Sequence, residues 1–146
     1  MIKHLLLTLA LLLLTGCTSL AKQPVFEDAG YAVRGYDVVA YFTESKPVKG
    51  QQQYQSLYQG SVWLFATEHN RDLFELSPQQ YAPQYGGYCT YAMSSGFVVS
   101  TDPQAFTIHQ DKLYLNYSLS VRENWLENKI QFIEEADAHW KDKIAE

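Results

Sequence analysis

The stretch YQSLYQGSVWLF, residues 54–65, contains two short runs in which apolar and polar side chains alternate. The runs Tyr54–Tyr58 and Ser61–Phe65 are separated by Gln59-Gly60, and a two-residue connection with glycine is typical of a β-hairpin. Thr67 follows directly and is a good N-cap, so a helix is expected to begin there. The sequence therefore predicts a hairpin followed at once by a helix.

The C-terminal half predicts a second hairpin and a long helix. Phe106–His109 and Leu113–Tyr117 alternate on either side of a polar turn. Ser120 and Glu123 have the spacing of a capping box, which predicts an amphipathic helix from there to about Ile144. Between the hairpins we expect a brief helix near residues 88–93 and a short strand over 97–99. Paired strands with segregated helices indicate an α+β fold: a small single domain with β-hairpins, short helices and a long C-terminal amphipathic helix.

Length and composition limit the classes of protein to consider. The chain has 146 residues, of which 47% are hydrophobic and 18% charged, which suits one globular domain. Its formal net charge is −5, and no basic stripe is present to bind phosphates. A nucleic-acid partner is therefore not expected.

The first 17 residues, MIKHLLLTLALLLLTGC, resemble a bacterial lipoprotein signal. Lys3 precedes a ten-residue apolar run that is too short to cross a bilayer, and small residues follow it. Leu14-Thr15-Gly16-Cys17 looks like a lipobox, in which Cys17 is lipidated and becomes the mature N-terminus. The alternative is an ordinary signal peptide whose cleavage site happens to contain cysteine.

This reading divides the chain into a signal peptide (1–16), a lipidated cysteine with a tether (17–30) and a domain (31–146). Several acyl chains would hold the protein on a membrane essentially permanently. Thr18, where an aspartate usually retains lipoproteins on the inner membrane, favours the periplasmic face of the outer membrane if the source has two membranes. The lipid anchor makes the membrane an expected partner.

Lipidation of Cys17 would leave Cys89 as a lone thiol in an oxidising compartment, so an internal disulfide is not expected. Two glycines precede Cys89 and could let a ligand or another backbone approach closely. If Cys89 lies in the first turn of a helix, its thiolate is favoured, and the sulfur is reactive or binds a metal. The alternative is that Cys89 is a small buried hydrophobic residue. His109 is the imidazole that could approach it in space.

Other candidate ligand-binding residues are aromatic or acidic. Asp37 stands among apolar and aromatic neighbours, so it either caps the following turn or lies in a pocket with tyrosines. Hydroxyls of several tyrosines could orient a ligand, although core packing explains each of them equally well. The tyrosines are Tyr36, Tyr41, Tyr85, Tyr88 and Tyr114.

The sequence resembles the YHS-domain family, in its secreted bacterial branch. The most specific blocks are Gly35-Tyr36-Asp37 and Tyr85-Gly86-Gly87-Tyr88-Cys89, and the similarity extends from about residue 31 to 140. Further matching blocks are Tyr54-Gln55-Ser56, Tyr58-Gln59-Gly60, Asp102-Pro103, Lys112–Asn116 and Ala136–Trp140.

The resemblance implies a small α+β module, found alone or attached to metal-handling proteins, without a settled activity. It leaves copper or another metal open as a cofactor. However, the two thiols of metal-associated relatives are replaced here by Ala66 and Asn70, and the histidine of the Tyr-His-Ser motif by Gln55. Soft-metal binding through those positions is therefore not expected.

Together these observations predict a non-enzymatic, lipid-anchored module that binds a metal ion or a small ligand in a pocket lined by tyrosines and Cys89. The alternatives are an envelope scaffold that binds a protein partner and a redox protein or enzyme that uses Cys89 as nucleophile. The candidate site residues are Tyr36, Asp37, Tyr41, Tyr85, Tyr88, Cys89 and His109, with Cys89 and His109 as the candidate metal ligands.

Overall fold

The structure is a computed structural model that describes residues 23–145. The predicted signal peptide, the predicted lipidation site Cys17 and the first part of the predicted tether lie outside the described residues. Within residues 23–145, no helix has both the length and the apolar character needed to span a bilayer.

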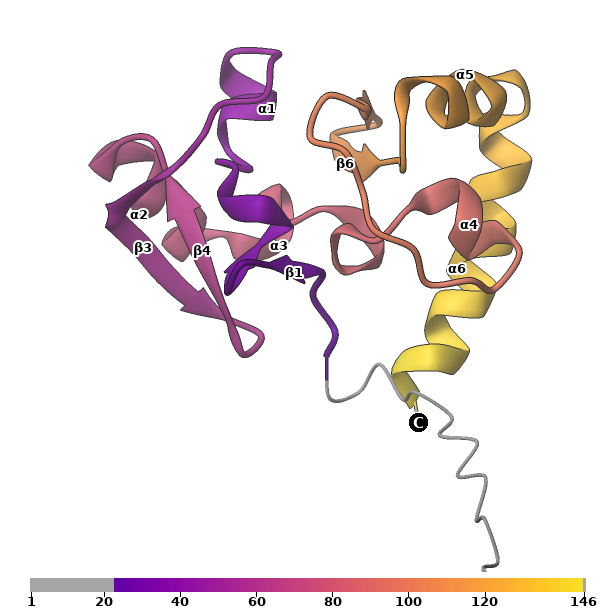
Figure 1. Ribbon diagram of the computed structural model, residues 1–146, viewed down its shortest axis with the longest axis horizontal. Coiled ribbons are helices and arrows are strands. Elements are labelled where there is room, and N and C mark those ends of the chain that lie inside the picture. The colour runs from indigo at the N-terminus through magenta and orange to yellow at the C-terminus, as the bar shows by residue number, and fades with distance from the viewer. Residues whose placement is uncertain (1–22, 146) are drawn as a thin grey trace, which may run out of the picture.

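The described chain combines three two-stranded antiparallel sheets with short helices and one long C-terminal helix, which confirms the α+β fold (Figure 1). The strand pairs are β1 (Glu27–Asp28) with β2 (Tyr31–Ala32), β3 (Gln51–Tyr58) with β4 (Ser61–Phe65), and β5 (Phe106–His109) with β6 (Lys112–Leu115). The α-helices are α1 (Ala40–Thr43), α2 (Glu68–Leu76), α3 (Pro78–Tyr81), α4 (Thr90–Ser94), α5 (Leu119–Glu127) and α6 (Lys129–Ala145). The 3₁₀ turns are η2 (Val33–Gly35) and η3 (Gln84–Gly87).

The predicted β3–β4 hairpin and the helix after it are confirmed. Gln59 and Gly60 both have positive φ, 50° and 77°, as the tight turn of a hairpin requires. The Thr67 hydroxyl accepts a hydrogen bond of 3.1 Å from the backbone N–H of Asn70, so Thr67 caps α2. The turn and the helix cap predicted from adjacent residues are therefore both present at this end of the molecule.

The long C-terminal helix differs from its prediction in two ways. Its cap is Ser118 rather than Ser120, because the Ser118 hydroxyl accepts the N–H of Val121 at 3.2 Å. It is also interrupted at Asn128, whose backbone (φ −135°, ψ 42°) is not helical, so that α5 and α6 are separate helices. The capping-box spacing identified the right region but the wrong serine.

The strand expected over 97–99 is not formed. Phe97 and Val98 are exposed, and Val99 contributes a single backbone bond, from its carbonyl to the N–H of Cys89 at 2.9 Å. One such bond fixes a loop but makes no ladder. The helix expected over 88–93 is present two residues later, as α4.

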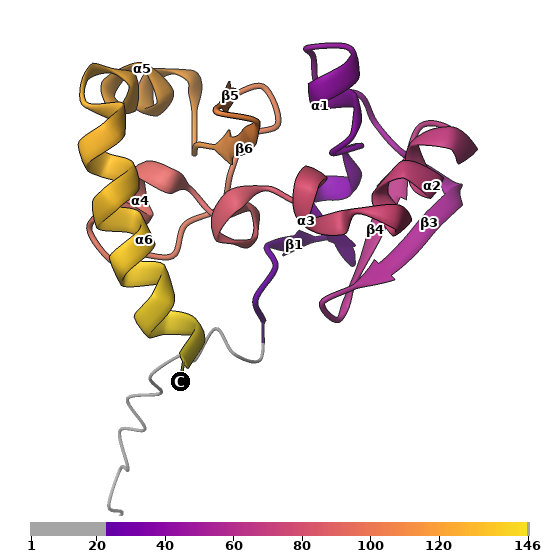
Figure 2. The ribbon, with the colours of Figure 1, turned by 180° about the vertical axis from the view of Figure 1, so that it is seen from behind.

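Two aromatic groups dominate one continuous core. At one end, where β3, β4 and α2 lie, Trp63 packs on Phe74 with ring centroids 5.2 Å apart (Figures 1 and 2). At the other end, where α4, α5 and α6 lie, Tyr114 packs on Trp125 at 5.5 Å. Both groups belong to the same cluster of buried residues.

Candidate functional site

Asp37 is completely buried, and its carboxylate accepts hydrogen bonds from other groups of the protein. Oδ1 accepts the backbone N–H groups of Val39 and Ala40 at 2.9 and 3.1 Å. Oδ2 accepts the backbone N–H of Ala66 and the side-chain amide of Asn70, both at 2.8 Å. With four donors on two oxygens, the carboxylate connects the start of α1 to the start of α2.

These contacts also test whether a metal fits where the family resemblance would place one. Ala66 and Asn70 stand where thiolates would be expected, and both donate to Asp37 instead. Within residues 23–145, no three His, Cys, Asp or Glu side chains gather closely enough to hold an ion. The residues present at these positions do not fit a metal site.

Cys89 is buried, with 1% of its surface exposed. Its Sγ accepts the backbone N–H of Tyr117 at 3.3 Å, and its thiol donates to Oδ1 of Asn116 at 3.5 Å. Burial raises the pKa of the thiol, although nearby backbone N–H groups, including that of Tyr117, act in the opposite direction. Cys89 is thus held as a neutral thiol, and no hydrogen bond among the described residues joins it to His109 on β5.

The glycine pair before Cys89 does permit a close backbone approach, by the protein's own N-terminal segment. Gly86 has φ 62°, and a Cβ at this position would lie 1.8 Å from the carbonyl oxygen of Pro24. The backbone N–H of Phe26 donates to the Gly86 carbonyl at 2.8 Å. The segment before β1 therefore occupies the space that the glycines leave.

The hydroxyls of three predicted tyrosines are bonded to different parts of the chain. Tyr41 donates to the carbonyl of Pro103 at 2.9 Å, and Tyr88 donates to the carbonyl of Gln23 at 3.1 Å. Tyr85 donates to Oδ1 of Asp137 on α6 at 2.7 Å. Burial raises the pKa of each of these hydroxyls. They hold segments together and do not converge on one pocket.

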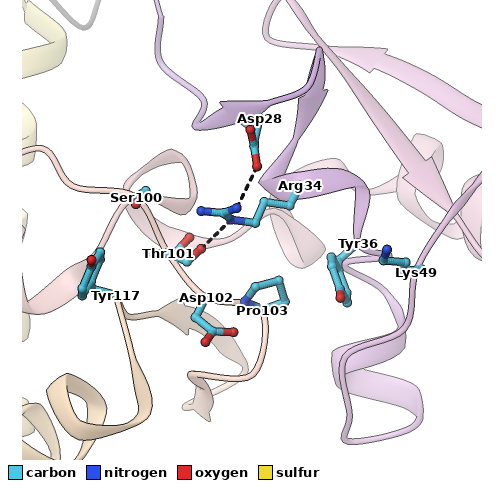
Figure 3. A pocket seen from close by; sticks show the side chains of 9 residues that line it. All are labelled: Asp28, Arg34, Tyr36, Lys49, Ser100, Thr101, Asp102, Pro103 and Tyr117. Atoms are coloured by element: carbon cyan, nitrogen blue, oxygen red, sulfur yellow. Dashed lines mark hydrogen bonds and ion pairs between the residues drawn. The ribbon is translucent and has the colours of Figure 1, made fainter.

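A cleft with a volume of about 570 Å³ lies between the N-terminal hairpin and the loop after Val99 (Figure 3). Its lining is polar and aromatic, with two cations and two carboxylates. The lining residues are Asp28, Arg34, Tyr36, Lys49, Ser100, Thr101, Asp102, Pro103 and Tyr117.

Arg34 joins the two walls of this cleft. Its Nη1 donates to Oδ2 of Asp28 at 2.7 Å, and its Nε donates to the carbonyl of Thr101 at 3.0 Å (Figure 3). Its guanidinium also lies over the ring of Phe26, 5.6 Å from the centroid. Three partners fix the side chain, so the cleft is held in shape without a ligand.

Of the seven residues predicted from the sequence, Tyr36 alone lines this cleft; Tyr85 lines a smaller hollow of about 180 Å³. The cleft was missed because its residues come from separate segments with no shared periodicity. One signal was available: Asp102-Pro103 and Tyr36 both lie in blocks that carry the family resemblance. No sequence signal pointed to Arg34 or Lys49.

Comparison with protein families matches residues 39–85 to the YHS domain. Comparison with curated proteins finds no match. Comparison with solved structures finds none either. Among the cleft residues, Lys49 alone lies inside the matched range, so the cleft is built largely by the segments that flank it. The chain therefore contains a YHS domain, over residues 39–85.

Proposed function

We propose that this chain is a lipid-anchored binding module on the periplasmic face of the outer membrane, and that it binds a small organic ligand in the Arg34 cleft. The anchor is inferred from the lipobox-like sequence that ends at Cys17. The observation that carries the binding function is the cleft itself, whose two walls are joined by a charged side chain with three partners of its own.

Size and lining favour a small molecule. Ligand sites commonly measure about 300–1,000 Å³ and combine a few fixed polar groups with aromatic surface. The cleft, at about 570 Å³, is within this range and offers Tyr36 and Tyr117 as aromatic surface. Because Arg34 is already fixed by its own partners, this side chain does not have to be ordered on binding.

An organic ligand is favoured over a metal ion and over thiol chemistry. A metal would need a donor set that residues 23–145 do not gather. A nucleophilic cysteine needs a lowered thiol pKa, whereas burial raises that of Cys89. Neither objection applies to the open cleft.

The binding proposal is tested by screening small polar metabolites against the full chain carrying Cys17→Ser, which prevents lipidation. A ligand at 100 times its Kd raises stability by about 2.7 kcal/mol, which thermal unfolding detects. Amide shifts confined to residues 34–36 and 100–102 in NMR spectra would locate the ligand. Tyr117→Ala, on the cleft, should weaken binding, and the distant exposed Leu76→Ala should not. A screen in which no compound shifts the cleft amides would overturn the proposal.

The anchor is tested separately in a bacterium with two membranes. The parent chain should incorporate labelled palmitate and fractionate with the outer membrane, and Cys17→Ala should do neither. Labelling that persists in Cys17→Ala would contradict the assignment.

A scaffold function is the second candidate, because one exposed apolar surface needs an explanation. Leu57 on β3 and Leu76 at the end of α2 are 73% and 83% exposed, and both line shallow hollows beside Tyr58 and Pro78. A photoreactive residue at position 76 should crosslink one reproducible envelope protein if this surface binds a partner. Absence of a specific crosslink would remove this candidate.

A further inference from the structure

We infer that the ligand of the Arg34 cleft is a small zwitterion with one ammonium and one carboxylate group, of the amino-acid and short-peptide class. This inference rests on the proposed binding function and specifies its ligand. It is drawn from the distribution of charge around the cleft.

The four charged side chains of the cleft divide into a pair and two separate groups. Arg34 and Asp28 neutralise one another through their 2.7 Å ion pair. Lys49 and Asp102 have no ion-pair partner among the described residues, although both line the cleft. The cleft therefore offers a ligand one free positive and one free negative charge.

Backbone contacts order the two segments that carry these charges. The Asp102 carboxylate accepts the N–H of Gln104 at 2.8 Å, and the Asp102 backbone N–H donates to the carbonyl of Asn116 at 3.0 Å. Lys49 forms a β-bridge with Tyr36, which the neighbouring bond from Gly50 N–H to the Gly35 carbonyl (2.9 Å) supports. Each charge is thus carried by an ordered segment.

The two charges come from different segments, with an aromatic ring in the same wall. Asp102 lies on the loop after Val99, whereas Lys49 forms an isolated β-bridge with Tyr36; in Figure 3 the Tyr36 ring is drawn between the Asp102 loop and the Lys49 side chain. A ligand ammonium would pair with Asp102 and could also contact the face of Tyr36. A ligand carboxylate would accept from the Lys49 ammonium.

A ligand with a single charge would satisfy only half of this arrangement. An anion would leave Asp102 partly desolvated without a partner, and a cation would do the same to Lys49. A volume of about 570 Å³ also exceeds what one inorganic ion fills and leaves room for a peptide-sized molecule. Charge and size agree on the same ligand class.

The test uses three matched probes on the full chain carrying Cys17→Ser: Ala-Ala, N-acetyl-Ala-Ala and Ala-Ala-amide. Acetylation removes the ammonium and amidation removes the carboxylate, while the peptide stays the same. Amide shifts of residues 34–36 and 100–102 would give the affinities. Ala-Ala should bind about tenfold more tightly than either blocked peptide.

Two variants assign the charges. Lys49→Gln should abolish the preference for Ala-Ala over Ala-Ala-amide, and Asp102→Asn should abolish the preference over N-acetyl-Ala-Ala. Asparagine keeps an oxygen for the Gln104 N–H, so the loop should stay intact. Lys46→Gln and Asp72→Asn, which change exposed charges outside the cleft lining, are the matched controls.

The outcomes separate this inference from the function on which it rests. If a blocked peptide binds as tightly as Ala-Ala, or if the control variants act like the cleft variants, the zwitterion assignment is overturned. The same holds if the three peptides leave the cleft amides unmoved while another compound from the screen binds there, in which case the binding function stands. If no compound binds there, both fail.

Discussion

The side-chain amide of Asn70 donates a 2.8 Å hydrogen bond to the carboxylate of Asp37, a residue 33 positions earlier in the chain. The same oxygen accepts the backbone N–H of Ala66 at 2.8 Å, so it links α2 and the end of β4 to the turn before α1. A charged acceptor in a buried position makes these bonds stronger than neutral ones. This part of the fold therefore depends on one carboxylate.

Replacing that carboxylate should lower the free energy of unfolding substantially. In Asp37→Asn, an amide NH₂ would face the N–H of Ala66 or the N–H groups of Val39 and Ala40, which leaves buried donors without an acceptor. We expect the free energy of unfolding to fall by about 3 kcal/mol. Urea denaturation measures it, and Asp72→Asn, an exposed carboxylate, is the control. Equal stability of the two variants would refute the role of Asp37.

The approach of the N-terminal segment to Gly86 can be tested with two glycine substitutions. Gly60→Ala, at φ 77° with nothing within 4 Å of the added methyl, should lose about 1 kcal/mol from backbone strain alone. Gly86→Ala has similar backbone strain and adds a collision with the Pro24 carbonyl. A further loss of about 1–3 kcal/mol is expected from this overpacking. Thermal unfolding compares the two, and a Gly86→Ala loss no larger than that of Gly60→Ala would exclude the contact.

Cys89 should be slow to alkylate in the folded protein. Burial raises the pKa of its thiol and also restricts access, and the thiolate is the reactive form. With Cys17 replaced by serine, iodoacetamide at pH 8 should modify the native protein at least about tenfold more slowly than the urea-unfolded chain. Mass spectrometry follows the reaction. Native alkylation at the unfolded rate would restore a reactive role for Cys89.

Stability should fall in alkaline solution because of buried tyrosines. Burial first, and then the hydrogen bond to Asp137, raise the pKa of Tyr85 above its ordinary value. In the unfolded chain tyrosine loses its proton near pH 10, whereas folded Tyr85 retains it, so the folded state binds more protons above that pH. The contribution of Tyr85 is complete below about pH 10 and declines above it, by about 1.4 kcal/mol per pH unit.

Tyr85→Phe isolates this effect. The variant should be less stable than the parent at pH 7, because it lacks the bond to Asp137, but its stability should fall less steeply between pH 10 and 11. Denaturation curves at each pH give the two slopes. Parallel slopes would mean that Tyr85 titrates alike in the folded and unfolded states.

Local signals predicted the parts of the fold that local physics decides. The Gln59-Gly60 turn and the Thr67 cap depend on a few adjacent residues, and both are present in the structure. Ser118 and Ser120 are both plausible caps from spacing, and only the bond to the Val121 N–H distinguishes them. No proline or glycine stands at Asn128 to indicate that the helix is interrupted there. The sequence therefore predicted one helix where the structure has two.

The candidate site was less predictable than the fold. The glycines before Cys89 correctly indicated a close approach, but the approaching group is Pro24, and no spacing in the sequence relates the two. Similarly, Arg34 contacts Thr101 across 67 positions, and that contact joins the two walls of the cleft. Contacts between residues so far apart in the chain depend on tertiary packing. No regular spacing in the sequence relates such residues, so these contacts could not be predicted from it.

The contact of Pro24 with Gly86 would also limit the distance between the domain and a bilayer if the proposed lipid anchor is present. The Tyr88 hydroxyl holds the carbonyl of Gln23, so the chain is already docked at its first described residue. If Cys17 carries lipid, six residues (17–22) connect it to the docked chain and span at most about 20 Å. The folded domain would then lie close to the lipid headgroups. It would therefore bind its ligand near the membrane surface.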